Sequence, residues 1–243
     1  GADDILTYVI SIVNSGPAPY TGLTMTDDLG AYTYGTGTLT PLTYVDGSLR
    51  YFVNGVLQAT PTPTADAPLT VPGIAVPAGG KALLIYETRV NSFAPLDTES
   101  TVTNTATLSG AGLTTPVQAA STVNARAAAY LTIGKAVSPA TVAENGTLTY
   151  TFTIQNYGNT AAAETDNVTV SDTFSPILKA ISVTYNGAAW TEGTQYTYNA
   201  ATGAFATTAG QITVPAASLT RDAATGAVVV TPGISTLTVT GTV

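Results

Sequence analysis

Side chains that could bind a metal ion gather in short acidic clusters. Asp27 and Asp28 are adjacent in the sequence, and Asp166 lies two residues after Glu164. Paired carboxylates on loops suit Ca²⁺, a hard cation that takes about six to eight oxygen ligands. None of the clusters has the spacing of an EF-hand. Asp27, Asp28 and Asp166 are therefore calcium candidates, and the alternative is that they are solvated acidic loops that keep a protein of low charge soluble.

The composition excludes most other chemistry. The 243 residues include no histidine and no cysteine, so the chain offers no imidazole base, no thiolate nucleophile and no ligand set for zinc, haem or iron–sulfur clusters. We therefore expect no enzyme activity and no cofactor other than calcium. The net charge of −8 repels phosphate backbones, which disfavours nucleic acid as a partner.

Two triplets match the acceptor pattern for N-linked glycan, Asn145–Thr147 and Asn167–Thr169. Asn145 and Asn167 are therefore glycosylation candidates, although such triplets also arise by chance in a threonine-rich sequence. No window reaches roughly 18 consecutive apolar residues, so we expect no membrane span in this chain. Low charge, threonine richness and strand patterning together favour an extracellular location at the cell surface.

Alternation of apolar and polar residues predicts the elements that must position these side chains. Residues 6–13 and 148–154 alternate as half-buried strands do. Asn-Gly, Asp-Gly and Pro-Gly dipeptides separate such runs and predict tight turns, for example at Asn54-Gly55 and Pro72-Gly73. No segment longer than a turn or two has helical periodicity. With 44% hydrophobic residues, the chain is expected to fold into packed, all-β domains.

The chain carries an internal repeat. Residues 4–27 have a counterpart in residues 147–172, and later hairpins follow in the same order. We therefore predict two domains, 1–126 and 127–243, joined near an alanine-rich linker. The copies begin and end at different points. The predicted strand 130–137 has no partner in the first repeat, and the predicted hairpin 100–123 has none in the second. The first repeat thus lacks its first strand, and the second repeat lacks its last hairpin.

These residues resemble a known family. The resemblance rests on Lys135, on the runs NGTLTYTFTIQNYG (145–158) and VTVSDTF (168–174), and on VTNTAT (102–107). Together they resemble the conserved surface repeat called domain of unknown function eleven, in two copies that cover nearly the whole chain. The resemblance implies two tandem immunoglobulin-like antiparallel β-sandwiches from an exported bacterial or archaeal protein, where such repeats serve as stalk, adhesin or envelope material. It specifies the fold better than the function.

Lys135 and Asn104 form a candidate pair for covalent chemistry. Related pilin and adhesin sandwiches join a lysine on the first strand to an asparagine on the last one through an isopeptide bond, with help from a buried carboxylate. A low-dielectric site favours the neutral amine that attacks. Here Lys135 lies on the first strand of the second repeat and Asn104 on the last hairpin of the first, so each repeat has one partner only. The alternative is that Lys135 extends along a strand end and Asn104 bonds a turn.

Incomplete sandwiches expose hydrogen-bonding groups, which neighbouring subunits can satisfy by adding a strand. Leu237, Val239 and Val243 in the alternating tail are the candidates for insertion into the next subunit, and repeated head-to-tail contacts would build a filament. The first hypothesis is therefore a structural, fibre-like, pilus-like or surface-layer subunit whose partners are copies of itself. The alternative is a stalk or adhesin segment of a longer surface protein, which spaces or binds a glycan or protein ligand through loops 59–71 and 191–203.

Overall fold

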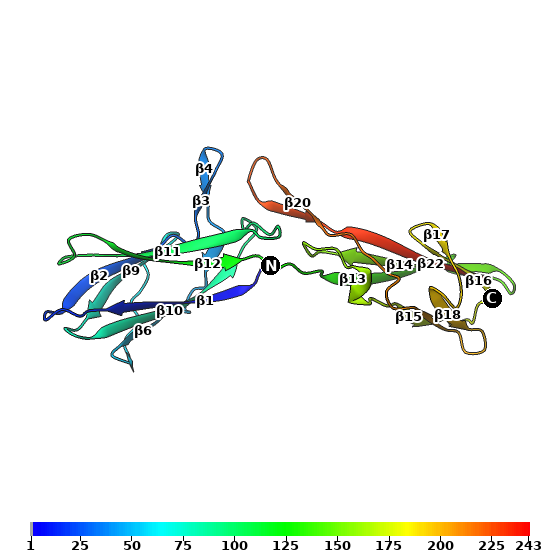
Figure 1. Ribbon diagram of the computed structural model, residues 1–243, viewed down its shortest axis with the longest axis horizontal. Helices are drawn as coiled ribbons and strands as arrows, with labels where there is room; N and C mark the ends of the chain where they lie inside the picture. Colours follow the sequence, from blue (N-terminus) through cyan, green and yellow to red (C-terminus); the bar gives the residue numbers. More distant parts are fainter. Residues whose placement is uncertain (1) are drawn as a thin grey trace. The chain divides into compact units, whose positions relative to one another are not determined.

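The structure is a computed structural model that describes residues 2–243, and nearly all of its regular structure is antiparallel β-strand (Figure 1). This confirms the predicted fold of tandem immunoglobulin-like β-sandwiches. Within the described residues, the one helical segment is the short 3₁₀ turn η1 (Glu164–Asp166). No helix in the described part of the chain is long and apolar enough to cross a lipid bilayer.

The described chain divides into two compact units. Unit 1 contains the residues up to Arg126 together with Thr220–Val229, and unit 2 contains Ala127–Leu219 and Val230–Val243. The segment Thr220–Val229 therefore differs from the predicted division, which placed all residues after 126 in one domain. It belongs to unit 1 because the Val228 amide donates a 2.7 Å hydrogen bond to the Ser92 carbonyl.

Unit 1 is built from two antiparallel sheets. The first has the order β1 (Ile5–Val13), β10 (Lys81–Val90), β6 (Arg50–Val53) and β7 (Val56–Leu57), with β5 (Leu42–Tyr44) also paired to β10. The second has the order β12 (Val117–Asn124), β11 (Thr101–Ser109), β2 (Tyr20–Asp27), β9 (Leu69–Val76) and β8 (Ala65–Asp66). A small hairpin consists of β3 (Tyr32–Tyr34) and β4 (Gly37–Leu39).

Unit 2 repeats this plan with five strands in one sheet and three in the other. The larger sheet has the order β13 (Leu131–Ser138), β14 (Thr147–Asn156), β22 (Gly233–Thr242), β16 (Lys179–Tyr185) and β17 (Ala188–Trp190). The smaller has the order β15 (Ser171–Thr173), β19 (Ala204–Thr207) and β18 (Tyr196–Asn199). Two further strands, β20 (Ser218–Arg221) and β21 (Val228–Thr231), pair with each other, and each has residues assigned to both units.

The two units correspond strand by strand. The order β1-β10-β6-β7 of unit 1 matches β14-β22-β16-β17 of unit 2, and β2-β9-β8 matches β15-β19-β18. Besides β5, which has no separate counterpart in unit 2, two differences stand out among the described residues. Strand β13 pairs with β14, whereas no strand lies on the corresponding side of β1. The hairpin β11–β12 pairs with β2, whereas no strand lies on the corresponding side of β15.

Each unit has its own core, formed by the alternate residues that face inward. In unit 1 the fully buried residues include Leu23, Leu69, Leu84 and Tyr86. In unit 2 Phe174 lies at the centre, with its ring centroid 4.8 Å from that of Tyr150 and 5.7 Å from that of Phe205. The alternation that predicted the strands therefore also predicted which side chains pack inward.

Turn chemistry explains most of the connections. Asn54 and Gly55 both have positive φ (50° and 83°) and join β6 to β7 as a tight hairpin turn. Pro72-Gly73 was predicted as such a turn, but this prediction is wrong. Gly73 lies inside β9 with φ of 77°, and the register against β2 shifts there, so the dipeptide forms a β-bulge that bends a continuous strand.

Candidate functional site

The outer edge of β1 is open. Strand β1 pairs with β10 along its length and has no neighbour on the other side among the described residues. Its outward residues are all exposed, and three of them are apolar: Ile5 at 44%, Val9 at 57% and Val13 at 72%. The Asn14 amide donates to Gly80 at the end of β10, so by alternation the amides of odd-numbered residues such as Ser11 point to the open side. This edge is an unpaired template for another strand.

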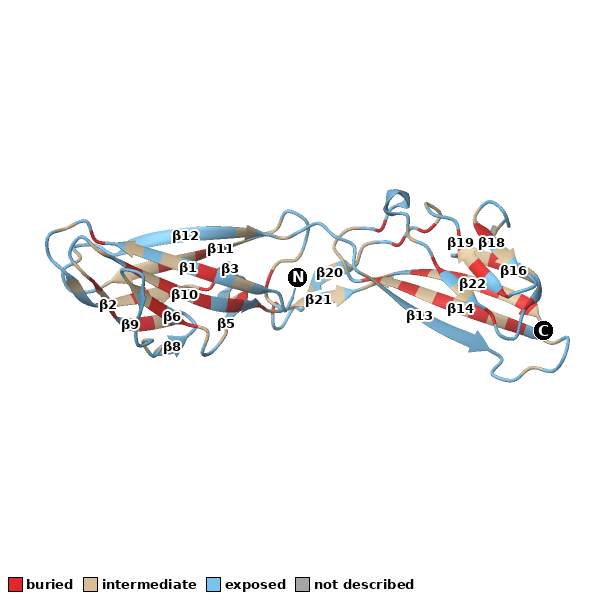
Figure 2. Ribbon diagram, turned by 90° about the horizontal axis from the view of Figure 1, so that it is seen from below, coloured by how far each residue is buried: buried red, intermediate tan, exposed pale blue. Residues whose placement is uncertain are grey.

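An apolar groove of about 170 Å³ lies beside this edge. Its walls come from both sheets of unit 1: Ile10 and Ile12 of β1, Met25 of β2, Leu108 of β11, and Val117 of β12. Every residue of β12 except Val123 is exposed, as Figure 2 shows by its pale blue colour. The groove therefore opens at the place where a further strand beside β1 would close the sandwich.

In unit 2, β13 occupies the corresponding place. It runs antiparallel to β14, with Ile133 opposite Ile154 and Lys135 opposite Phe152. Since Phe152 and Ile154 are core residues, Ile133 and Lys135 face the same side as the core. Ile133 is nevertheless 56% exposed, because unit 2 has no counterpart of the β11–β12 hairpin to cover it. Each unit thus contains the strand type that the other one lacks.

A buried polar cluster in unit 1 is centred on Asp27, the last residue of β2. Its side chain is fully buried. Oδ1 accepts a 2.8 Å hydrogen bond from the Leu29 amide, and Oδ2 accepts one of 2.8 Å from Asn104 Nδ2 and a short one from the Tyr86 hydroxyl. The amide of Gly30 donates to Asn104 Oδ1 at 3.0 Å. A carboxyl group, a phenol and a polarised carboxamide therefore meet inside the sandwich.

Burial controls the proton affinities of this cluster. Desolvation raises the pKa of Asp27 above its ordinary value, and the hydrogen bonds from Tyr86, Leu29 and Asn104 oppose that shift. Burial, together with the neighbouring Asp27 charge, raises the pKa of Tyr8 to about 12 and also raises that of Tyr86. The Tyr8 hydroxyl is buried and has no hydrogen-bond partner. An unsatisfied buried hydroxyl costs about 1–3 kcal/mol, so a polar group brought to Tyr8 would be stabilised there.

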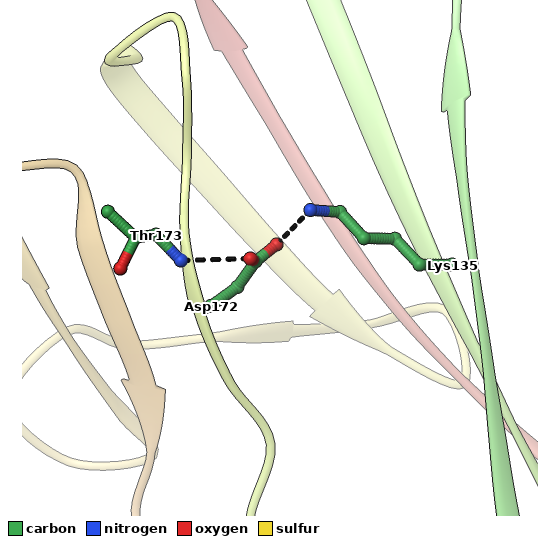
Figure 3. A network of polar contacts seen from close by, with 3 residues as sticks. All are labelled: Lys135, Asp172 and Thr173. Atoms are coloured by element: carbon green, nitrogen blue, oxygen red, sulfur yellow. Dashed lines mark hydrogen bonds and ion pairs between the residues drawn. The ribbon is translucent and has the colours of Figure 1, made fainter.

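The equivalent aspartate of unit 2 has a different partner. Asp172 in β15 forms an ion pair with Lys135 Nζ, and its Oδ1 accepts a 2.8 Å hydrogen bond from the Thr173 amide (Figure 3). The lysine ammonium lies 4.8 Å from the ring centroid of Tyr150 and 5.8 Å from that of Phe174. The Lys135 side chain is 42% exposed and that of Asp172 19%. The pair is therefore partly solvated, and its contribution to stability is small.

The predicted isopeptide partners are not brought together. Asn104 lies in unit 1, where it binds Asp27, and Lys135 lies in unit 2, where it pairs with Asp172. The alternative interpretation, that Asn104 bonds a turn, is partly realised, because its Oδ1 accepts from Gly30 in the loop after β2. Each unit therefore contains an aspartate with one of the two candidate partners.

The calcium candidates are engaged in hydrogen bonds. Asp27 is enclosed as described, Asp28 Oδ1 accepts from the amides of Gly30 and Thr105 at 2.9 Å, and Asp166 Oδ2 accepts from the Ala163 amide at 2.8 Å. Within residues 2–243, no three acidic side chains come together in a way that could hold a metal ion. Calcium binding by these residues stays an untested prediction.

The predicted strand-exchange residues belong to the chain's own core. Strand β22 is central in its sheet, paired with β14 on one side and β16 on the other (Figure 1). Leu237 and Val239 are fully buried, and Val243 exchanges backbone hydrogen bonds with Asn145 and Gly146. The expectation that this tail inserts into a neighbouring subunit is therefore wrong, because unit 2 needs it.

The remaining predicted sites lie on the surface. Asn145 and Asn167 are both exposed and both have positive φ, 59° in the turn before β14 and 53° after η1. Their position is compatible with modification, which stays a prediction. The segment 191–203, considered as a binding loop, contains β18 with its buried Tyr196. Part of that segment is therefore core.

Sequence reasoning missed the roles of Tyr86 and Tyr8. Nothing in the sequence places the Tyr86 hydroxyl on Asp27, 59 residues away along the chain. One signal was present. A tyrosine at a fully buried mid-strand position must find a polar partner for its hydroxyl, and Asp27 is the acid that ends β2 in the other sheet of unit 1.

No family model and no curated protein sequence matches the chain. Among solved structures, the pilus backbone protein RrgB of Streptococcus pneumoniae aligns with a TM-score of 0.31 and 10% identity over 95% of this chain. The chain spans about half of that protein, 48% of its length. A mutant of the CFA/I adhesin CfaE of enterotoxigenic E. coli aligns with a TM-score of 0.26 and 12% identity over 100% of this chain and 83% of the adhesin. At such low similarity, function has to be argued from this chain's own geometry.

Proposed function

We propose that this protein is extracellular structural material of a cell surface, and that its sandwiches are completed by strands from neighbouring copies. The observation that carries the proposal is the open edge of β1. A strand of nine residues with exposed Val9 and Val13 lies beside an apolar groove. Natural sheets usually block such edges with charges, proline or a covering loop, and this edge has none of these within β1 itself. An edge left open in this way favours strand addition.

The internal repeat supports the same conclusion. Strand β13 shows that a strand beside the β14-type position completes this sandwich, and β14 is the counterpart of β1. The absence of histidine and cysteine makes a structural role more economical than an enzymatic one. When one end of a molecule completes the opposite end of the next copy, the contact is head-to-tail. Such contacts build a filament unless the copies close into a ring.

The test is assembly at rising concentration, followed by light scattering and electron microscopy. Ser11→Pro removes an edge amide that points away from β10, and proline is tolerated on an edge strand. We expect the unmodified chain to form oligomers or filaments, Ser11→Pro to remain monomeric, and the matched variant Ser11→Ala to assemble normally. A chain that stays monomeric at every concentration would contradict self-assembly.

In that event the second candidate function would apply, a stalk or adhesin segment that spaces or binds a surface glycan or protein ligand. The observation that favours it is the segment around Thr60 to Thr64, an exposed Thr-Pro run between β7 and β8. A glycan array probed with the monomeric chain tests this function directly.

A further inference from the structure

Unit 1 holds two parts of a three-part reactive site, and unit 2 holds the missing part. In unit 1 the carboxyl of Asp27 contacts the carboxamide of Asn104, and its described hydrogen-bond partners include no lysine. In unit 2 the equivalent carboxyl of Asp172 contacts the amine of Lys135 and the Thr173 amide, and its described partners include no asparagine. We propose that a β13 strand from a second copy adds to the open edge of β1 and that its Lys135 forms an isopeptide bond with Asn104. This inference deepens the proposed function and relies on the same edge.

The register of unit 2 predicts where the incoming lysine lies. Tyr8 of β1 corresponds to Tyr150 of β14, because each lies six residues before the asparagine that ends the strand pattern, Asn14 or Asn156. Lys135 is opposite Phe152, so an added β13 strand places its lysine opposite Ile10. In unit 2 the amine in that position reaches over the Tyr150 ring to Asp172. In unit 1 the side chain of the added lysine would extend over the Tyr8 ring and end at Asp27.

The surroundings of Asn104 favour attack of the lysine amine on its carboxamide carbon. Its Nδ2 lies 2.8 Å from Asp27 Oδ2, so an amine that reaches Asp27 is next to the carboxamide carbon. Its Oδ1 accepts a hydrogen bond from Gly30, which stabilises negative charge on that oxygen as the amine adds. The side chain of Asn104 is 3% exposed, and a bound strand would exclude water that competes as a nucleophile.

The chemistry needs no external reagent. Beside Asp27 the lysine ammonium first gives one proton to the carboxylate, which leaves a neutral amine and a protonated Asp27. The neutral amine attacks Cγ of Asn104, so a bond forms between Nζ and Cγ while the bond from Cγ to Nδ2 breaks. Protonated Asp27 gives its proton to the departing nitrogen, which leaves as ammonia, and then takes a proton from Nζ. The products are one secondary amide, one ammonia molecule and protonated Asp27. Burial of Asp27, which raises its pKa, supports this use of the carboxyl as a proton carrier.

The residues of β13 explain why this strand, from a second copy, fits the open edge of β1. On the core-facing side, β13 presents Leu131, Ile133, Lys135 and Val137, which is an apolar strand with one central amine. The apolar members match the groove lined by Ile10 and Ile12. In unit 2 the strand lies at a sheet edge and pairs with β14 alone, so its transfer to β1 exchanges one antiparallel ladder for an equivalent one, and its partly solvated ion pair adds little to the cost.

The experiment mixes the full chain with a synthetic peptide of residues 130–139 and measures intact mass under denaturing conditions. We expect an adduct lighter than the sum of its parts by one ammonia, with fragment ions that join the peptide lysine to Asn104. The matched Lys135→Gln peptide should bind without forming an adduct. Asn104→Ala protein should form none, and Asp27→Asn should react about 100-fold more slowly. Concentrated full chain alone should show covalent dimers with the same linkage.

The outcomes separate the covalent step from strand addition. Binding of both peptides without any adduct overturns the isopeptide bond and leaves the proposed function in place. Failure of both peptides to bind overturns both. An adduct with the peptide but no covalent dimer of the full chain overturns the second copy as the donor, and shows that the edge takes a free strand of the β13 type instead. Circular dichroism of each variant verifies its fold, and the Lys135→Gln peptide keeps the test valid if Asn104→Ala fails to fold.

Discussion

Asp27 and Asp172 occupy the same position in the two units but have different surroundings. Asp27 is fully buried, with Asn104 and Tyr86 on its carboxylate, whereas Asp172 is partly exposed and pairs with Lys135. The difference follows from which neighbouring strands are present. Hairpin β11–β12 covers the aspartate in unit 1, and β13 brings a lysine to it in unit 2. The same sandwich fold thus places an asparagine beside the aspartate in unit 1 and a lysine beside it in unit 2.

The largest expected effect comes from removing residues 235–243. Because β22 is the central strand of its sheet and contains the buried Leu237 and Val239, we expect unit 2 to lose its fold while unit 1 keeps its own core. Trp190, the chain's single tryptophan, packs on Tyr185 in unit 2 and reports that loss by fluorescence. Native tryptophan fluorescence in the truncated chain would mean that unit 2 folds without this tail. That result is expected only if the tail serves as a strand for exchange with a neighbouring subunit.

The second prediction contrasts the two aspartates. Asp27→Ala leaves buried donors on Tyr86 and Asn104 without an acceptor, so we expect a loss of about 3 kcal/mol in the free energy of unfolding of unit 1. Asp172→Ala removes a partly solvated ion pair and should cost about 0.5 kcal/mol in unit 2. Urea denaturation followed by hydrogen exchange of each unit measures both values. Equal costs would show that the two environments are energetically alike.

The third prediction contrasts two equivalent glycines. A Cβ on Gly158 would lie 2.7 Å from the Tyr130 amide and in contact with the Ala128 carbonyl, in the segment that leads into β13. At Gly16 it would meet only Asn14 Oδ1, at 3.2 Å. We expect Gly158→Ala to cost about 2 kcal/mol and Gly16→Ala less than about 0.5 kcal/mol. Thermal unfolding of the two variants gives the comparison, and a large cost at Gly16 would indicate a segment packed beside β1.

The smallest effect is a pH dependence confined to unit 1. Burial raises the pKa of Asp27 in the folded state, so its stabilising contribution is complete below the ordinary aspartate pKa and is lost as the pH rises through the folded value. Unit 1 should therefore be more stable in mild acid than at neutral pH. The variant Asp27→Asn should lack this dependence. Urea midpoints at several pH values test it, and a slope that persists in Asp27→Asn would assign the effect to another group.

The strands were predictable because alternation is a local signal. The predicted strands 6–13 and 148–154 lie within β1 and β14, and the asparagines of the repeated Asn-x-Gly pattern make the same contact in both units. Asn14 Oδ1 and Asn156 Oδ1 each accept a 2.9 Å hydrogen bond from the amide of the glycine two residues later. Short-range chemistry of this kind can be read from one sequence.

Long-range partners could not be read in the same way. Asn104 and Asp27 lie 77 residues apart, and their contact depends on how β11 pairs with β2. The tail was misread because alternation identifies a strand but not its place in a sheet, so a central strand such as β22 looks like a spare one. Pro72-Gly73 was misread because the same dipeptide can end a strand or bend one.

Amide hydrogen exchange of β1 tests most directly whether unit 1 accepts a strand at its open edge. The amides of Thr7, Val9 and Ser11 point away from β10 and should exchange rapidly in the free chain. With the peptide of residues 130–139 bound, we predict that these three amides become protected, while those of β22, already paired on both sides, do not change. Unchanged exchange at Thr7, Val9 and Ser11 in the presence of saturating peptide would contradict strand addition at this edge.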